Sequence, residues 1–214
     1  MLTILITGFE PFDGDTINSS LEAIRLLGCH RADGARLATA VLPVSITRIE
    51  PALREMLAEH RPDAVIAVGQ ANTRVDISVE RVAINIDDFR VPDNDGAQPV
   101  DVPVVRGGPA AYFSTLPIKA ITQRLRAAGV PAQVSQTAGT FLCNHTFYLL
   151  CHLAAIRHPA MRAGFLHVPP LPQQAACNPG QSSMALETIV AGLKIAIETV
   201  RDISTDLRVS EGQI

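Results

Sequence analysis

The sequence predicts an α/β protein, a single α/β/α sandwich domain around a central, twisted and mostly parallel (mixed) sheet. Short apolar runs that end at glycine or proline alternate along the chain with longer segments of helical periodicity. Of 214 residues, 47% are apolar and only 4% aromatic. The core is therefore built from Leu, Ile, Val and Ala, a mixture typical of helices packed on a sheet. No repeat or low-complexity segment interrupts the alternation, so residues 1–214 are expected to form one domain.

The first part of the chain predicts two strands and two helices. In order, we expect a strand over Leu2–Thr7, a loop over 8–14, a helix after a Ser19…Glu22 capping box, a strand over Arg36–Leu42 and a helix over Thr47–His60. Pro51 fits that last helix only in the first turn, because proline cannot donate an interior helical hydrogen bond. A Thr47…Glu50 capping box would place it there.

The rest of the chain continues the alternation. We expect strands over Ala64–Gly69, Val130–Gln136 and Arg162–Val168, and one or two further strands within Val75–Ile86. Helices are expected over Pro117–Ala128, Cys143–His158 and Ser182–Asp202. The segment Asp87–Gly108 is rich in Pro, Asp and Gly and is expected to be a long functional loop. The polar tail, 204–214, is expected to be loose.

Charge and composition exclude several classes of function. The formal net charge is −3 and no run of Lys or Arg occurs, so a nucleic-acid or anionic-membrane surface is not expected. The apolar stretches are too short to span a bilayer. The N-terminal residues have the pattern of a strand and lack that of a signal peptide, so we expect a cytoplasmic protein with reduced thiols. No Cys pair has zinc-ribbon spacing and no His pair has metalloprotease spacing, so no metal or other cofactor is expected.

One of the four cysteines stands where a thiol can be activated. Cys143 follows a strand and a turn of small residues, at or near the start of a long helix. The positive end of the helix dipole and the free N–H groups of the first turn favour a thiolate and could hold an oxyanion. Residues alone leave a second interpretation open, in which Cys143 is a small buried apolar side chain. Cys151 lies inside the helix and fits the core, whereas Cys29 and Cys177 lie near loops and receive no role.

Two further segments carry groups that could serve such a nucleophile. His167 ends an apolar strand just before two prolines, at a strand end where clefts form in layered sheets. It is either a base or a structural cap of the strand. Glu80 interrupts an apolar strand pattern, and it either pairs with Arg74 or Arg81 at the surface or points inward. A carboxylate, a thiol and an imidazole can form a triad in any chain order.

Several blocks of sequence together carry a family resemblance. They are Leu5–Phe12 with Asn18–Ser20, Gly69–Ala71, Ser78–Asn85, Tyr112–Pro117, Ala138–Asn144 and Phe165–Pro169. Along nearly its whole length the chain resembles the pyroglutamyl peptidase I family of cysteine peptidases, also called pyrrolidone carboxyl peptidases. Phe141-Leu142 stand where the family often has Tyr-Val, a change of similar character. The resemblance raises Cys143 from one of two interpretations to the predicted nucleophile.

The resemblance implies hydrolysis of the amide bond after an N-terminal pyroglutamyl (5-oxoproline) residue of peptides. It assigns Cys143 as nucleophile, His167 as base and Glu80 as the group that orients the imidazole. The backbone N–H of Cys143 and the side chain of Arg90 would hold the oxyanion. The substrate-binding residues would be Phe9, Phe12, Asn18, Val44, Gln70, Val91, Phe141 and Leu142. For Asn18, capping of the first helix is a sufficient explanation, and Phe9 and Phe12 are expected in a loop outside the core.

Two other functions remain open from the residues. A protein that binds pyroglutamyl peptides without cleaving them would keep the pocket, and a nucleoside phosphorylase-like enzyme would use an anion site near Gly8 and Gly69. Fold alone does not choose between them. The resemblance further implies a homodimer or homotetramer and no cofactor.

Overall fold

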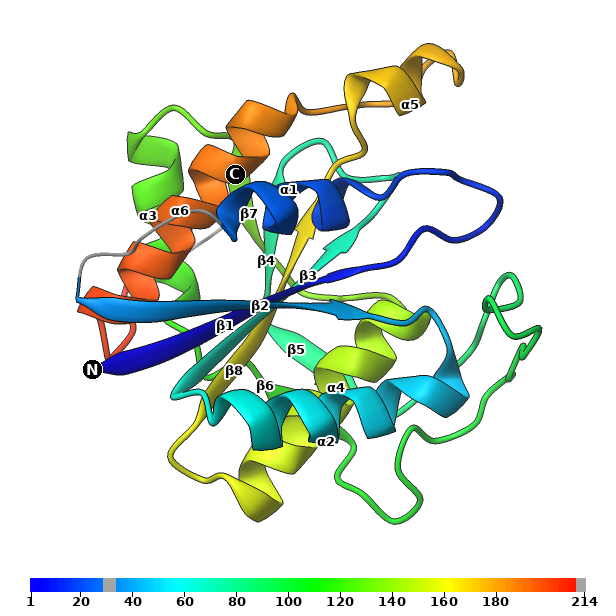
Figure 1. Cartoon of the computed structure of the whole chain (residues 1–214), viewed down its shortest axis with the longest axis horizontal. Coiled ribbons are helices and arrows are strands. Elements are labelled where there is room, and N and C mark those ends of the chain that lie inside the picture. The colour runs from blue at the N-terminus through cyan, green and yellow to red at the C-terminus, as the bar shows by residue number, and fades with distance from the viewer. Residues whose placement is uncertain (29–33, 211–214) are drawn as a thin grey trace.

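The computed structural model describes residues 1–28 and 34–210 and forms an α/β/α sandwich (Figure 1). Its main sheet has six strands in the described part of the chain. In spatial order they are β2 (Ala35–Leu42), β1 (Leu2–Phe9), β3 (Ala64–Gln70), β8 (Arg162–Val168), β4 (Ile77–Glu80) and β7 (Ala132–Ser135). The prediction of an α/β fold with a mostly parallel, mixed sheet is confirmed.

One antiparallel pairing makes the sheet mixed. β2, β1, β3 and β8 are parallel, whereas β4 runs antiparallel to β8 and parallel to β7. The register sets Glu80 opposite Phe165 and Ser78 opposite His167. Paired residues point to the same face of a sheet and side chains alternate along a strand, so Glu80 and His167 share a face.

Helices cover both faces of the sheet. They are α1 (Ser19–Leu27), α2 (Ile46–His60), α3 (Ile118–Ala127), α4 (Leu142–Arg157), α5 (Pro172–Ala176) and α6 (Leu186–Asp202). Figure 1 shows α1, α3 and α6 on one face and α2 and α4 on the other. Two buried apolar clusters fill the interfaces. None of the helices in 1–28 and 34–210 is long and apolar enough to cross a membrane.

Two helix starts differ from the prediction. Asn18 caps α1, which confirms the capping role predicted for this residue but places the cap one residue before the expected capping box. Its Oδ1 accepts from the backbone N–H of Ser20 at 3.0 Å. Ser45 caps α2, two residues before the expected Thr47. Since α2 begins at Ile46, Pro51 lies in its second turn, so the expectation of a first-turn proline is wrong.

The limits of several other strands and helices also differ from the prediction. β1 extends to Phe9. The segment within Val75–Ile86 forms two strands, as one of the predicted alternatives had it: β4 of the main sheet and β5 (Val82–Ile84), which pairs with β6 (Ala111–Phe113) in a second small sheet. The sequence did not predict β6 or α5, which are short. The final helix begins at Leu186, later than expected.

The long loop after β5 is irregular as predicted but firmly anchored. Asp87 forms an isolated bridge with Val102. Asp93 accepts from the backbone N–H of Ile46 at 2.7 Å, and Asp95 forms an ion pair with Arg48. The loop is thereby clamped to the N-terminus of α2, which sets the position of the residues between Asp87 and Asp93.

Part of the C-terminal tail contacts α3. The α3 N-terminus has no side-chain cap of its own, and Asp206 accepts there from the backbone N–H groups of Lys119 and Ala120 at 3.1 Å each. A carboxylate at this end of a helix is favoured by the dipole. Residues 211–214 and Cys29 lie outside the described residues.

Candidate active site

Cys143 is the second residue of α4, at the N-terminal end predicted from the sequence. The chain reaches it through a turn in which Gly139 adopts a φ of 79°, a conformation that favours glycine. The residue before the helix, Phe141, has an extended backbone and provides no side-chain cap. The first N–H groups of α4 therefore lack intrahelical acceptors. They place partial positive charge beside the half-buried Cys143 thiol.

Gly69, on β3, makes room for the sulfur. A Cβ atom at this position would lie 2.9 Å from Cys143 Sγ and 2.8 Å from Phe165 Cζ. Real Cβ atoms do not approach other atoms so closely, so the strand can pass behind the thiol only because residue 69 has no side chain.

Replacing Gly69 with alanine should therefore displace the Cys143 sulfur. We expect kcat/KM for the reaction proposed below to fall by about 10- to 100-fold, because small misplacements of reacting groups have effects of this size. Gly28→Ala is the matched control, since a Cβ there has no heavy atom nearer than 3.5 Å. Equal activity of the two variants, both folded by circular dichroism, would contradict this account of Gly69.

His167 and Glu80 complete the cluster. His167 Nδ1 lies 2.8 Å from Glu80 Oε1, and both side chains are buried. A carboxylate only accepts, so Nδ1 carries the hydrogen and Nε2 is left for the thiol. Cys143 lines the same cleft as His167 and is among the groups that raise the pKa of His167. The structure thus brings the three predicted catalytic side chains together from α4, β8 and β4. The alternative of Glu80 at the surface is wrong, because Glu80 is 0% exposed.

The environment of His167 favours its protonated form. Burial lowers the pKa of His167, but the Cys143 sulfur and the Glu80 carboxylate outweigh burial and raise it to about 9. Cys151 is different, because burial raises the pKa of its thiol to about 12. A thiol with such a pKa is unreactive at neutral pH. The prediction that Cys151 belongs to the core agrees with its burial.

A small, almost wholly apolar recess opens on Cys143. Its lining residues in the described chain are Phe9, Phe12, Asn18, Val44, Gln70, Phe141, Leu142 and Cys143. Seven of the eight residues predicted from the resemblance to bind substrate are among them; the eighth, Val91, lines the outer cleft instead. Phe141 packs against Phe12 and Phe89, with ring centroids 5.9 and 4.5 Å apart. Phe89, which was not among the predicted residues, is buried behind this wall.

Some of these residues also hold the fold. Phe9 belongs to the core as the last residue of β1, so its expected place in a loop outside the core is wrong. Asn18 caps α1 and donates to the carbonyl of Glu10 at 3.2 Å. The Gln70 side chain accepts from Ser19 N–H at 2.8 Å and donates to Asn72 at 2.9 Å. These bonds fix the amide groups that face the recess.

Arg90 and Val91 lie farther out, in a wider cleft that is more polar than the recess and also contains Cys143 and His167. The Arg90 side chain is 82% exposed and lies 3.9 Å from Asp13. The structure thus places Arg90 in the same cleft as the thiol but does not bring it into the triad.

Further buried polar contacts hold the site together, and the sequence analysis missed them. Asn144, next to the nucleophile, accepts from Ile84 N–H and donates to the carbonyls of Ile84 and Ile86, all within 3.0 Å. His145 Nδ1 lies 2.8 Å from Asp87 Oδ2 in a buried pair. Both contacts fix the first turn of α4 to the start of the long loop. The sequence signal for these contacts was Asn144, a polar residue directly after the predicted nucleophile in an otherwise apolar helix.

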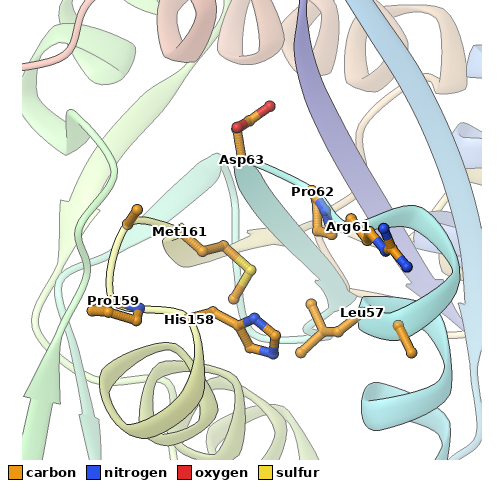
Figure 2. A pocket seen from close by; sticks show the side chains of 9 residues that line it. Leu57, Arg61, Pro62, Asp63, His158, Pro159 and Met161 are labelled. Carbon is orange, nitrogen blue, oxygen red and sulfur yellow. The ribbon is translucent and has the colours of Figure 1, made fainter.

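A second hollow, of about 500 Å³, lies near the opposite ends of β3 and β8. Figure 2 shows its walls, which include Leu57 at the end of α2 and His158 and Met161 after α4. None of its lining residues carries a thiol or a hydroxyl group. The recess described above, in contrast, is lined by the thiol of Cys143. No group of three or more potential metal ligands occurs within residues 1–28 and 34–210.

Comparisons with known proteins agree on one family. The family model for pyroglutamyl peptidase matches residues 2–203. A pyrrolidone-carboxylate peptidase 1 from Ralstonia nicotianae is 55% identical over 100% of both chains. The crystal structure of pyroglutamyl peptidase I from Bacillus amyloliquefaciens is 42% identical with a TM-score of 0.93, covering 97% of this chain and 100% of that one. The pyrrolidone carboxyl peptidase of Thermococcus litoralis is 40% identical with a TM-score of 0.90, covering 94% of each. The chain belongs to the pyroglutamyl peptidase family.

Proposed function

We propose that this protein hydrolyses the amide bond after an N-terminal pyroglutamyl residue, with Cys143, His167 and Glu80 as its catalytic residues. The observation that carries the proposal is the apolar recess that opens directly on the sulfur of a Cys–His–Glu cluster. A substrate ring held in the recess would place its acyl carbon beside the nucleophile.

The cluster supports acyl transfer in two steps. The Cys143 thiolate attacks the pyroglutamyl carbonyl, and the oxyanion that forms is held by N–H groups at the start of α4. Imidazolium His167 then protonates the leaving amine as the C–N bond breaks. Water, deprotonated by His167, attacks the thioester and releases 5-oxoproline and the thiol. Glu80 holds the ring orientation throughout. Arg90 would add a second oxyanion donor if its side chain turned from the rim into the cleft.

The recess suits a neutral lactam. Its walls are apolar, while Asn18 and Gln70 provide amide groups for one N–H and one carbonyl. None of the described residues that line it is acidic. An ordinary peptide would bury its N-terminal ammonium there without a counter-charge, which is unfavourable. The pocket therefore selects pyroglutamyl over unmodified N-termini by exclusion.

The test is release of a fluorescent amine from a pyroglutamyl amide, with the prolyl and glutamyl amides as controls. We expect turnover of the first substrate only. The pKa of His167, near 9, predicts that kcat/KM falls above about pH 9, because neutral imidazole cannot protonate the leaving amine. Binding without turnover would favour the non-catalytic alternative. Phosphate-dependent cleavage of nucleosides would favour the phosphorylase alternative, which no feature of the described site supports.

The resemblance also implies an assembly of two or four copies. A cytoplasmic location is proposed as well, because it would keep the Cys143 thiol reduced. Light scattering on the purified protein tests the assembly, and a monomer at all concentrations would refute it. Fractionation of cells that express the protein tests the location.

A further inference from the structure

The guanidinium of Arg74 contacts the catalytic carboxylate. Its Nη2 lies 3.2 Å from Glu80 Oε1, 2.9 Å from Ser135 Oγ and 2.8 Å from the carbonyl oxygen of Thr137. The side chain is 23% exposed, whereas Glu80 is fully buried. Arg74 thus meets the triad from the loop after β3, on the side of Glu80 that faces the cleft.

The Arg74 backbone is held as well. Its N–H donates to the carbonyl of Ala71 at 3.1 Å, and its carbonyl accepts from the Ser182 hydroxyl at 2.7 Å. The guanidinium in turn joins Glu80 to Ser135 and Thr137, which begin the turn that leads to Cys143. One side chain therefore connects the carboxylate of the triad to the segment that positions its nucleophile.

The charges explain why an arginine is needed there. Glu80 Oε1 accepts from both His167 and Arg74, while Oε2 is buried and has no hydrogen-bond partner among the described residues. A buried carboxylate is costly unless it is paired. His167 gains and loses its proton during the proposed reaction, so it is an intermittent partner. Arginine keeps its charge at every working pH.

We propose that Arg74 is a positioning residue of the catalytic cluster. It keeps Glu80 ionised and directed at His167 Nδ1 while the charge of the imidazole changes, and it fixes the turn before Cys143 to the same carboxylate. This inference rests on the proposed function. The other ionisable groups that line the cleft or flank β4 are Asp13, Asp76, Arg81, Arg90 and Cys143.

Arg74→Gln should lower kcat for a small pyroglutamyl amide by about 10- to 100-fold, as expected when a group that orients a catalytic residue is lost. KM should stay within about twofold. Removal of a cation disfavours every nearby anion. The acidic limb of the pH profile should therefore move to higher pH. Arg74→Lys should restore most of the pH profile but only part of the rate, because an ammonium cannot reproduce the guanidinium geometry.

The pH dependence of alkylation by iodoacetamide measures the effect of Arg74 on Cys143 without requiring substrate hydrolysis. Peptide mapping would follow Cys143 and use the exposed Cys177 as an internal reference. In Arg74→Gln the pH at which Cys143 reacts should rise while that of Cys177 stays constant. If the wild type shows no turnover but alkylation still shifts, the proposed function fails and the role of Arg74 stands.

The matched control is Arg54→Gln, which breaks an exposed arginine–glutamate pair with Glu50 and should change neither profile. The proposal would be overturned if kcat fell while the pH profiles of turnover and of Cys143 alkylation both stayed unchanged, or if only KM rose. Arg74 would then be a structural or substrate-binding residue. If Arg74→Gln does not fold, Arg74→Lys and Ser135→Ala decide. Ser135→Ala keeps the cation, so a shifted profile in that variant would refute the electrostatic role.

Discussion

Cys143→Ser should reduce hydrolysis of a pyroglutamyl amide by about 10⁴-fold or more, a loss typical of removing a catalytic nucleophile. The serine hydroxyl fits the space of the thiol but has a much higher pKa. The helix dipole and His167 can convert a thiol to its anion, but they cannot do so for a hydroxyl. The measurement is the rate of fluorescent amine release by equal amounts of folded enzyme, with stability checked by thermal unfolding.

Two other cysteines provide the controls. Cys177→Ser alters an exposed thiol and Cys151→Ala a buried one whose pKa is raised to about 12. Both variants should keep near wild-type kcat, with Cys151→Ala losing some stability because it leaves a small cavity. Loss of activity in Cys177→Ser or Cys151→Ala equal to that in Cys143→Ser would reject Cys143 as the nucleophile.

The sequence predicted most of the fold because its strands and helices are strongly patterned. Ala64–Gln70 is wholly buried, and a run of this kind can be identified without knowing its neighbours. Helix starts were less certain because adjacent residues are equally good caps. Asn18 and Ser19, and likewise Ser45 and Thr47, can each accept from a free N–H, and tertiary contacts decide between them.

The site was predicted only in part, for a reason that lies in the topology. Cys143 and His167 stand at the ends of their elements, which is where patterns in sequence are informative. Whether Glu80 faces the core depends on strand order and on the antiparallel direction of β4, and neither follows from periodicity. Arg74 could be named as a partner of Glu80 but not chosen over Arg81, because the choice depends on how the loop after β3 folds back. Family resemblance supplied what local pattern could not.

Glu80→Gln should lower kcat/KM by about 10³- to 10⁴-fold, comparable to losing the carboxylate that orients a catalytic histidine. An amide fills the same space, but its NH₂ group can turn toward His167 and favour the wrong tautomer. The substitution also removes an anion that raises the pKa of His167. The fall in activity at alkaline pH should therefore move below pH 9, and pH profiles of kcat/KM measure it directly.

The direction in which the pH profile moves distinguishes an electrostatic effect of the substitution from a general disruption of the site. Glu80→Gln removes an anion and should move the profile to lower pH, whereas Arg74→Gln removes the cation beside it and should move the profile to higher pH. A general disruption of the site would not shift the pH profile in opposite directions when the two partners of one ion pair are replaced in turn. Glu50→Gln and Arg54→Gln repeat both changes in an exposed pair and should shift nothing. Shifts of the same sign at Glu80 and Arg74 would mean that the charges of this pair do not set the ionisation of Cys143 and His167.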